Sequence, residues 1–409
     1  MSRSSTSPKL SIESIWEAKK MLSHLLAPTP MLYNGWLSQA LGCELYLKLE
    51  NMQPVGSFKI RGATYKISKL SAKERKSGVI AASAGNHAQG VAWGAKKLGT
   101  NAWIVMPKTA SLLKIKNTEA LGAKVILEGD NYDEASEHCL KLARKSKRTI
   151  VHPFEDSDVM AGQGTLGLEI LDQLPDVDVV IGSIGGGGLM AGVSTALKAH
   201  SKAIRVYGSQ ATGASAMSDA FHALHPIKLK TTNTFADGIA VRTARPLLYK
   251  ILKRNLTGIL LADDEMIAEA LLTLMERAKI VTEGAAAVSY AVLPQIKEKL
   301  AGKKVVLIVC GGNIDVNLMG KIIDRGLGKL GRRLRLSVRI SDVPGSLARL
   351  TTQIATTGAS IIQAIHDRNE PTAPLNSTEV NITLETQGPE HARAIVKELK
   401  PEVEALKVL

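Results

Sequence analysis

Hydrophobic and polar positions in the first 330 residues alternate between short apolar runs and longer amphipathic stretches. The apolar runs predict strands at 44–50, 78–83, 102–106, 124–127, 149–152, 177–181, 204–208 and 304–310. The amphipathic stretches predict helices at 11–26, 63–67, 86–98, 111–121, 131–145, 189–200, 263–278 and 284–300, with another ending at 174. Strands alternating with helices predict parallel sheets covered on both faces. We therefore predict an α/β fold with two parallel-sheet halves that face each other across a cleft.

The pattern changes at about residue 331. Strands are predicted at 335–340, 360–367 and 378–384, and helices at 346–357 and 390–399. This β-α-β-β-α order predicts a separate small α+β domain. Residues 332–409 carry 10 Lys and Arg against 9 Asp and Glu, so nearly all of the chain's net charge of +14 precedes them. We expect one region at 1–328 and another at 332–409.

Composition narrows the classes of partner and compartment. The chain has 409 residues, 45% hydrophobic and 22% charged, which is typical of a soluble globular protein. Its basic residues are scattered apart from a loose group at 321–335, and aromatics make up only 4%, so we expect no nucleic-acid partner. No apolar run approaches the roughly 18 residues of a membrane helix, and the N-terminus lacks a signal-like apolar segment. We expect a cytoplasmic protein with no membrane partner.

The cysteines and histidines indicate no metal or disulfide chemistry. Cys43, Cys139 and Cys310 are far apart and form no C-x-x-C pair, which fits a reducing compartment. His222 and His225 lie three residues apart but lack further ligands. We expect no metal site.

Lys59 is the strongest candidate for chemistry. It lies between Phe58 and Ile60 in the segment PVGSFKIRGA, with glycines on both sides. An amine held dry in such a place can react with a carbonyl group as a Schiff-base lysine. A surface lysine at the start of a helix is the alternative.

A second candidate is the run of glycines that follows the strand predicted at 177–181. The backbone amides of Gly185, Gly186, Gly187 and Gly188, at the start of a helix, predict a site for a phosphate monoester. A dinucleotide-binding loop is less well supported, because Met190 occupies the position of the third glycine. A tight turn without a ligand is the other alternative.

Four motifs together resemble those of threonine and serine dehydratases, which belong to the fold type II family of pyridoxal-phosphate enzymes. They are SFKIRGA at 57–63, SAGNHAQG at 83–90, GGGGL at 185–189 and CGGN at 310–313. The resemblance covers about 11–324. It implies a fold like that of the tryptophan synthase β subunit, with a large domain at about 1–55 and 159–328 and a small domain at about 56–158.

The resemblance also implies the roles of individual residues. Lys59 would hold pyridoxal 5'-phosphate and remove the α-proton of a small amino-acid substrate. Other groups would bind the cofactor: the phenolic oxygen by Asn86, the phosphate by Gly185–Gly188 and Leu189, the pyridine nitrogen by Cys310, and further contacts by Phe58, Gly238 and Glu283. The substrate carboxylate would be received by Ser83, Ala84, Gly85, Asn86 and His87. Taken alone, Asn86 could be a helix cap and Cys310 a structural thiol.

Two alternatives to a dehydratase remain to be weighed. Serine racemases share this fold, but they place a serine before the Gly-Asn-His sequence, where this chain has Ala84, which cannot exchange a proton. Family members that bind a divalent cation use carboxylates in the stretch that is here 210–216, which contains none. A non-catalytic amino-acid sensor is the alternative from another class, although it would not need the four motifs.

The C-terminal region resembles an ACT domain. ACT domains commonly pair side by side and bind an amino acid near the turn between the first strand and the first helix. The resemblance implies an amino-acid effector near Asp342 and Gly345, in the turn DVPGS, and a homodimer or homotetramer. A plain turn before a helix is the alternative. Neither the preference for threonine over serine nor the identity of an effector follows from the sequence.

Overall fold

The computed structural model describes residues 10–368 and 374–409. The chain divides into two compact units, Met1–Ile314 and Asp315–Leu409. In the described part of the chain, no helix combines the length and apolar character needed to cross a membrane.

The larger sheet of the first unit has six strands in the order β1-β2-β10-β7-β8-β9. All neighbours run parallel except β1, which pairs antiparallel with β2. The strands are β1 Met31–Tyr33, β2 Glu44–Leu49, β7 Val179–Ser183, β8 Arg205–Ala211, β9 Gly258–Ala262 and β10 Lys304–Val309. Burial is nearly complete along β7, β8 and β10, as expected for a sheet covered on both faces.

A second, smaller sheet lies in the same unit. Its order is β5-β4-β3-β6, all parallel, with β3 Val79–Ala82, β4 Ala102–Met106, β5 Lys124–Leu127 and β6 Thr149–Ile150. Two parallel sheets in one α/β unit confirm the predicted fold class.

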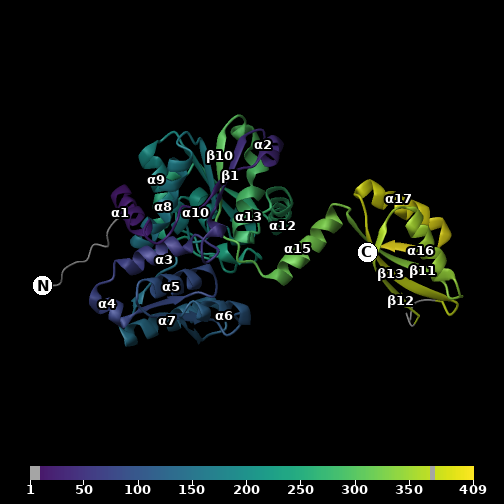
Figure 1. The fold of residues 1–409 in the computed structure, drawn as a ribbon, viewed down its shortest axis with the longest axis horizontal. Coiled ribbons are helices and arrows are strands. Elements are labelled where there is room, and N and C mark those ends of the chain that lie inside the picture. Colours follow the sequence, from purple (N-terminus) through teal and green to yellow (C-terminus); the bar gives the residue numbers. More distant parts are fainter. Residues whose placement is uncertain (1–9, 369–373) are drawn as a thin grey trace. The chain divides into compact units, whose positions relative to one another are not determined.

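Helices cover these sheets, and Figure 1 shows α3 between α8 on one side and α5 on the other. They are α1 Ile12–Leu22, α2 Gly35–Leu41, α3 Lys59–Ser68, α4 Ala72–Ser77, α5 Asn86–Lys97, α6 Leu112–Ala120, α7 Tyr132–Ser146, α8 Ser157–Gln173, α9 Gly188–His200, α10 Ala216–Ala223, α11 Pro246–Asn255, α12 Asp264–Thr273, α13 Gly284–Ala291 and α14 Lys297–Leu300. Short helical turns lie at Glu50–Met52, Thr212–Ala214, Asp237–Ile239, Leu274–Ala278 and Leu293–Ile296.

Glycines bring α3 close to both neighbouring helices. A Cβ on Gly162 of α8 would lie 2.6 Å from Cα of Gly62 in α3. On the other side, a Cβ on Gly90 of α5 would lie 3.0 Å from the backbone of Lys59. A methyl group at either place would push the helices apart, so the position of Lys59 depends on these close contacts.

Buried charges also attach α3 to the larger sheet. Arg61 Nε donates to Glu50 Oε2 at 2.7 Å. Arg61 Nη1 donates to Oε1 of Glu169, on α8, at 2.6 Å. Lys48 of β2 donates to Glu169 Oε2 at 2.8 Å. All four side chains are almost completely buried. Two cations and two anions balance one another, which offsets the penalty for removing each from water.

The second unit has an antiparallel sheet in the order β12-β13-β11-β14. The strands are β11 Arg333–Ser341, β12 Ser360–Asp367, β13 Ser377–Glu385 and β14 Ala405–Val408, and the helices are α15 Val316–Lys329, α16 Ser346–Thr356 and α17 Pro389–Leu399, with a short turn at Lys400–Glu402. Leu336, Val338, Ile382, Ile354 and Ile395 form the centre of its own hydrophobic core.

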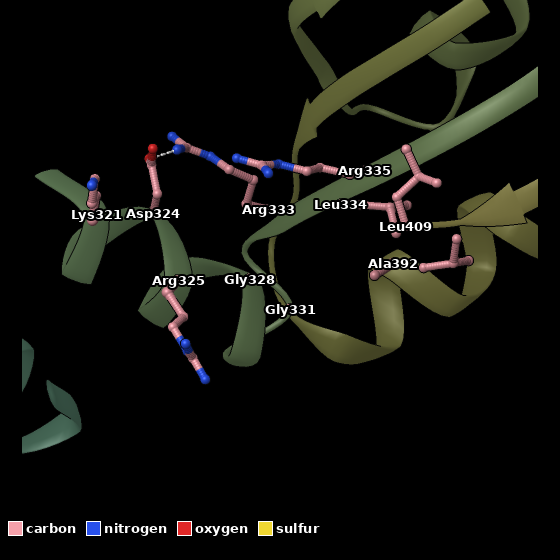
Figure 2. Close-up of a pocket in the computed structure, with 11 residues that line it drawn as sticks. Lys321, Asp324, Arg325, Gly328, Gly331, Arg333, Leu334, Arg335, Ala392 and Leu409 are labelled. Carbon is pink, nitrogen blue, oxygen red and sulfur yellow. Dashed lines mark hydrogen bonds and ion pairs between the residues drawn. The ribbon is translucent and has the colours of Figure 1, made fainter. Parts of the chain in front are cut away.

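A hollow of about 520 Å³ lies within the second unit, between α15 and the start of β11. Figure 2 shows Lys321 and Arg325 on α15 and Arg333 and Arg335 on β11. An ion pair between Asp324 and Arg333 joins the helix to the strand. Helix α15 therefore packs with the second unit, whereas the sequence patterns predicted no helix there.

Candidate active site

Lys59 is the first residue of α3, and its side chain is half-buried in the first unit. Its Nζ donates to the carbonyl of Pro153 at 3.2 Å and lies 5.1 Å from the centre of the Phe58 ring. Burial lowers the pKa of this amine to about 8, even though the nearby Glu283 carboxylate favours its charged form. At this pKa roughly a tenth of the amine is neutral at pH 7, far more than for an ordinary lysine, and the neutral amine is the nucleophile and base.

The loop before Lys59 is joined to the end of β10. Phe58 N donates to Cys310 O at 3.0 Å, and Gly312 N donates to Gly56 O at 2.9 Å. Gly56 has a φ of 69°, a conformation that other residues rarely adopt. Two motifs more than 240 residues apart in the sequence thus form one local structure.

Asn86, the first residue of α5, connects this structure to the start of α13. Its Nδ2 donates to Glu283 Oε1 at 2.7 Å, and its Oδ1 accepts from Asn313 Nδ2 at 2.7 Å. Burial, with a contribution from Asp237, raises the pKa of Glu283 to about 7. The Glu283 carboxyl can therefore hold or release a proton close to neutral pH.

The glycine run lies between β7 and α9 and contacts two other loops. A Cβ on Gly186 would lie 2.3 Å from the ring of Phe154, and one on Gly185 would lie 3.3 Å from the carbonyl oxygen of Gly238. Gly187 has a φ of 99° and caps α9. The predicted phosphate loop consequently lies at the start of a long helix, beside the loop that contains Gly238, and Leu189 follows it in the first turn.

The Cys310 thiol is buried at the end of β10. Ser183 Oγ of β7 donates to its sulfur at 3.3 Å, and the thiol donates to Ala285 O at 3.5 Å. Burial and the nearby Glu283 raise the pKa of this thiol to about 12. Cys310 is therefore neutral over the physiological range, in contrast to a carboxylate at the same place.

The segment predicted to receive the substrate carboxylate connects β3 to α5. Gly85 N donates to Ser83 Oγ at 3.2 Å, and a Cβ on Gly85 would meet no other atom within 4 Å. Ala84 presents only a methyl group. The His87 side chain is buried, its Nε2 donates to Val151 O at 2.8 Å, and burial lowers its pKa to about 3. The imidazole is thus neutral and engaged with the backbone.

The structure brings the cofactor and substrate candidates together in the first unit, whereas Asp342 and Gly345 belong to the second. Sequence reasoning missed Pro153 and Phe154, which contact Lys59 and the glycine run, and it assigned no role to Asn313. Pro153 and Phe154 follow a short strand without any recurring pattern, so only the fold reveals them. Among the described residues, no group of three or more His, Cys, Asp or Glu could hold a metal ion.

A lysine of lowered pKa, a run of glycines at the start of a helix and two parallel sheets occur together in one enzyme class. The family model described as "Pyridoxal-phosphate dependent enzyme" matches residues 22–311. The chain belongs to this family of pyridoxal-phosphate-dependent enzymes.

Individual relatives narrow the similarity further. The chain is 43% identical over 390 residues to the L-threonine ammonia-lyase of Thermotoga maritima, covering 95% of this chain and 97% of that protein. The processed form of threonine deaminase isoform 2 from Solanum lycopersicum has a TM-score of 0.74 at 34% identity, over 78% of this chain and 90% of that one. Maize serine racemase also has a TM-score of 0.74, at 30% identity, over 79% of this chain and 99% of that one.

The residues present fit pyridoxal phosphate. Lys59 offers a half-buried amine of lowered pKa, and Gly185–Gly188 offer backbone amides at the start of α9 without side chains of their own. Gly311 also has a steric reason to be a glycine, since a Cβ there would lie 2.3 Å from Glu283 Oε1 and 3.2 Å from Asn86 Nδ2. The chain thus supplies an attachment point, a phosphate site and polar groups for a ring.

Proposed function

We propose that the protein is an L-threonine ammonia-lyase that also accepts L-serine. Threonine would give 2-oxobutanoate and ammonia, and serine would give pyruvate and ammonia. The observation that carries this proposal is the half-buried Lys59 amine, of pKa about 8, in a chain 43% identical to an L-threonine ammonia-lyase.

Each group at the site has a proposed task. Lys59 anchors pyridoxal phosphate and removes the substrate's α-proton with its neutral amine. The cofactor supplies an electron-withdrawing ring that stabilises the charge left at the α-carbon. The β-hydroxyl then leaves as water, with its proton supplied by the Lys59 ammonium or a nearby acid, and hydrolysis of the resulting enamine yields the 2-oxo acid and ammonia.

Binding of cofactor and substrate is divided between the loops. The amides of Gly185–Gly188 and the first turn at Leu189 hold the phosphate, while Phe58 and Gly238 pack nearby. Asn86 donates to the phenolic oxygen, and Glu283 lies beside Asn86. The Ser83 hydroxyl and the amides of 84–87 take the substrate carboxylate, with an orienting effect on the α-proton.

Cys310 favours elimination over reactions that need a long-lived carbanion. Its thiol has a pKa of about 12 and stays neutral, so it can hydrogen-bond a pyridine nitrogen without holding it protonated by charge. Weaker delocalisation of charge into the ring favours prompt departure of the β-hydroxyl.

Serine racemase is the second candidate, since maize serine racemase shares the fold at 30% identity. Racemisation needs a proton donor on the face opposite Lys59. Ala84 has no exchangeable proton, which favours the lyase. The deciding experiment is a 2-oxo-acid assay with L-threonine, L-serine and their D-forms, together with chiral analysis of recovered serine. Rapid interconversion of L- and D-serine with little pyruvate would overturn the lyase proposal.

A separate measurement would distinguish the enzyme from a non-catalytic amino-acid sensor. A pyridoxal-phosphate enzyme shows a visible band from its lysine-bound cofactor, and borohydride should abolish that band and attach the cofactor to Lys59. A purified protein that remains colourless with added pyridoxal phosphate would favour the sensor.

We propose further that the second unit is an ACT-like regulatory domain and that the enzyme is a homodimer or homotetramer in the cytoplasm. Strand β12 is an edge of its sheet and exposes Ile362 and Ile365 by 49% and 51%. An apolar edge strand of this kind favours pairing with a second copy. Three unpaired cysteines, all buried, fit a reducing compartment.

An amino-acid effector would bind near Asp342 and Gly345. Gly345 has a φ of 89° and caps α16, and the start of a helix favours an anion such as a carboxylate. Arg368 Nη2 already donates a hydrogen bond to Asp342 Oδ2 at 2.7 Å. The ammonium group of an effector would therefore displace Arg368. Isoleucine and valine are the first to test; an unchanged rate and unchanged apparent affinity for threonine with all amino acids would refute regulation.

A further inference from the structure

Asn313 is the last residue of the CGGN turn, and its side-chain amide contacts two segments. Its Nδ2 donates to the backbone carbonyl of Val55 at 2.8 Å and to Asn86 Oδ1 at 2.7 Å. A Cβ added to Gly56 would lie only 2.6 Å from Asn313 Oδ1. The amide therefore lies against the loop that precedes Lys59, while the residue as a whole is exposed.

These contacts determine the direction of each amide. The Val55 carbonyl can only accept a hydrogen bond, so the nitrogen end of the Asn313 amide must face it. The same nitrogen donates to Asn86, so the oxygen end of the Asn86 amide must face Asn313. The nitrogen end of Asn86 is left facing Glu283, at 2.7 Å.

We propose that Asn313 is a positioning residue that keeps the Asn86 amide nitrogen directed toward the cofactor ring. The inference rests on the proposed contact between Asn86 and the phenolic oxygen of pyridoxal phosphate. A reversed Asn86 amide would present its carbonyl oxygen to that electron-rich oxygen, and a hydrogen bond would become a repulsion.

Substitutions at Asn313 separate this role from simple packing. Asn313→Asp nearly preserves the volume, but a carboxylate cannot donate to Val55 or Asn86, so the Asn86 amide turns its nitrogen toward Asp and away from the ring. Asn313→Ala removes the donor without forcing that reversal. If Asn313 positions Asn86, Asn313→Asp should weaken cofactor binding more than Asn313→Ala does. If Asn313 only fills space, Asn313→Ala should weaken it more.

A matched control lies in a neighbouring loop. Asn51 Nδ2 donates to the carbonyl of Val281 at 3.0 Å and makes no hydrogen bond to Asn86 among the described contacts. Asn51→Asp introduces the same chemical change without reversing the Asn86 amide.

The experiment measures the dissociation constant of pyridoxal phosphate and the pH midpoint of the visible band of the holoenzyme. We expect Asn313→Asp to weaken cofactor binding about 10- to 100-fold, as loss of a hydrogen bond to a charged group implies, and to move the midpoint. Asn313→Ala should be milder, and Asn51→Asp should stay within about twofold of the parent. An Asp variant no worse than the Ala variant, with an unmoved midpoint, would overturn the role of Asn313.

Two further variants keep the test decisive if Asn313→Asp fails to fold. When Asn313 acts through Asn86, Asn313→Ala should change cofactor affinity less than about twofold in an Asn86→Ala background. Additive losses would overturn the inference while leaving the proposed function intact. If Asn86→Ala alone leaves both the cofactor affinity and the visible band unchanged, the Asn86 contact itself is wrong, and this inference fails with it.

Discussion

Arg61 and Glu169 form a two-point contact inside the first unit, with Nη1 to Oε1 at 2.6 Å and Nη2 to Oε2 at 2.8 Å. Arg61 lies two residues after Lys59 on α3, and Glu169 is on α8. Although burial opposes ionisation, Arg61 and Lys48 hold the pKa of Glu169 below its usual value. The contact fixes the helix that starts with the reactive lysine.

Removing Arg61 should therefore be strongly destabilising. Arg61→Ala leaves Glu50 buried without a cation and Glu169 with Lys48 alone, and we expect a loss of about 3–5 kcal/mol in the free energy of unfolding. Urea titration measures it. The control is Lys69→Ala, which removes an exposed ion pair with Glu17 and should cost less than about 1 kcal/mol. Equal losses in the two variants would contradict the structural role of Arg61.

Lys59→Ala should abolish formation of 2-oxobutanoate while the fold is retained. The substitution removes both the attachment point of the cofactor and the base, so we expect a loss of more than about 10³-fold in kcat. Circular dichroism checks the fold. Lys66→Ala, on the same helix but paired with Asp156 and Asp158, is the control and should stay active. Turnover near the parental rate in Lys59→Ala would contradict the assignment.

Ala84→Ser should raise racemisation relative to elimination. The substitution places a hydroxyl in the segment between β3 and α5, where the parent has only a methyl group, and a hydroxyl can exchange a proton. Chiral chromatography of serine, with pyruvate measured in parallel, gives the ratio of the two reactions. The expectation fails if the ratio does not rise.

Two histidines of lowered pKa should make the stability of the fold depend on pH. Burial lowers the pKa of His87 to about 3 and of His152 to about 4, against about 6.5 in the unfolded chain. The unfolded state binds more protons below pH 6.5, so stability is present above that pH and is lost as the pH falls toward 4 and then 3. At pH 5, His87 alone should account for a loss of about 2 kcal/mol.

Glu283 acts in the opposite direction over part of this range. Its raised pKa of about 7 means that stability falls as the pH rises from about 4.5 to 7, because the folded state binds the proton more tightly. The test therefore compares the parent with His87→Asn by urea titration from pH 7.5 to 5. The variant should lose less stability on acidification, and parallel curves would show that His87 does not contribute.

Much of the fold follows from the sequence because buried parallel strands and amphipathic helices have distinct periods. The predicted helix at 284–300 is interrupted, since Pro294 lies in a short turn between α13 and α14. Helix α15 was missed because Gly320, Gly326 and Gly328 weaken its helical signal. Strand β9 was also missed, although its sequence GILLA is a short apolar run of the expected kind.

The candidate site could likewise be predicted from the sequence only in part. Lys59, Asn86 and Cys310 could be found because each lies in a compact motif at the end of a predicted strand or the start of a helix. The contact between Phe154 and Gly186 could not be found, because it joins segments with no shared pattern in the sequence. The orientations of the Asn86 and Asn313 side-chain amides could not be predicted either, because they depend on distances that only three-dimensional packing determines.

The burial of the three cysteines determines how the protein can be labelled at introduced thiols. Cys43, Cys139 and Cys310 are all buried, and burial raises the pKa of each thiol, to about 11, 11 and 12. Thiolates are the form that maleimide and iodoacetamide attack, so the native chain should be almost silent toward these reagents. A single cysteine introduced on an exposed face of each unit would then be the only readily labelled thiol pair. Fluorescence energy transfer between the two dyes would then measure the distance between the units, with all three native cysteines left in place.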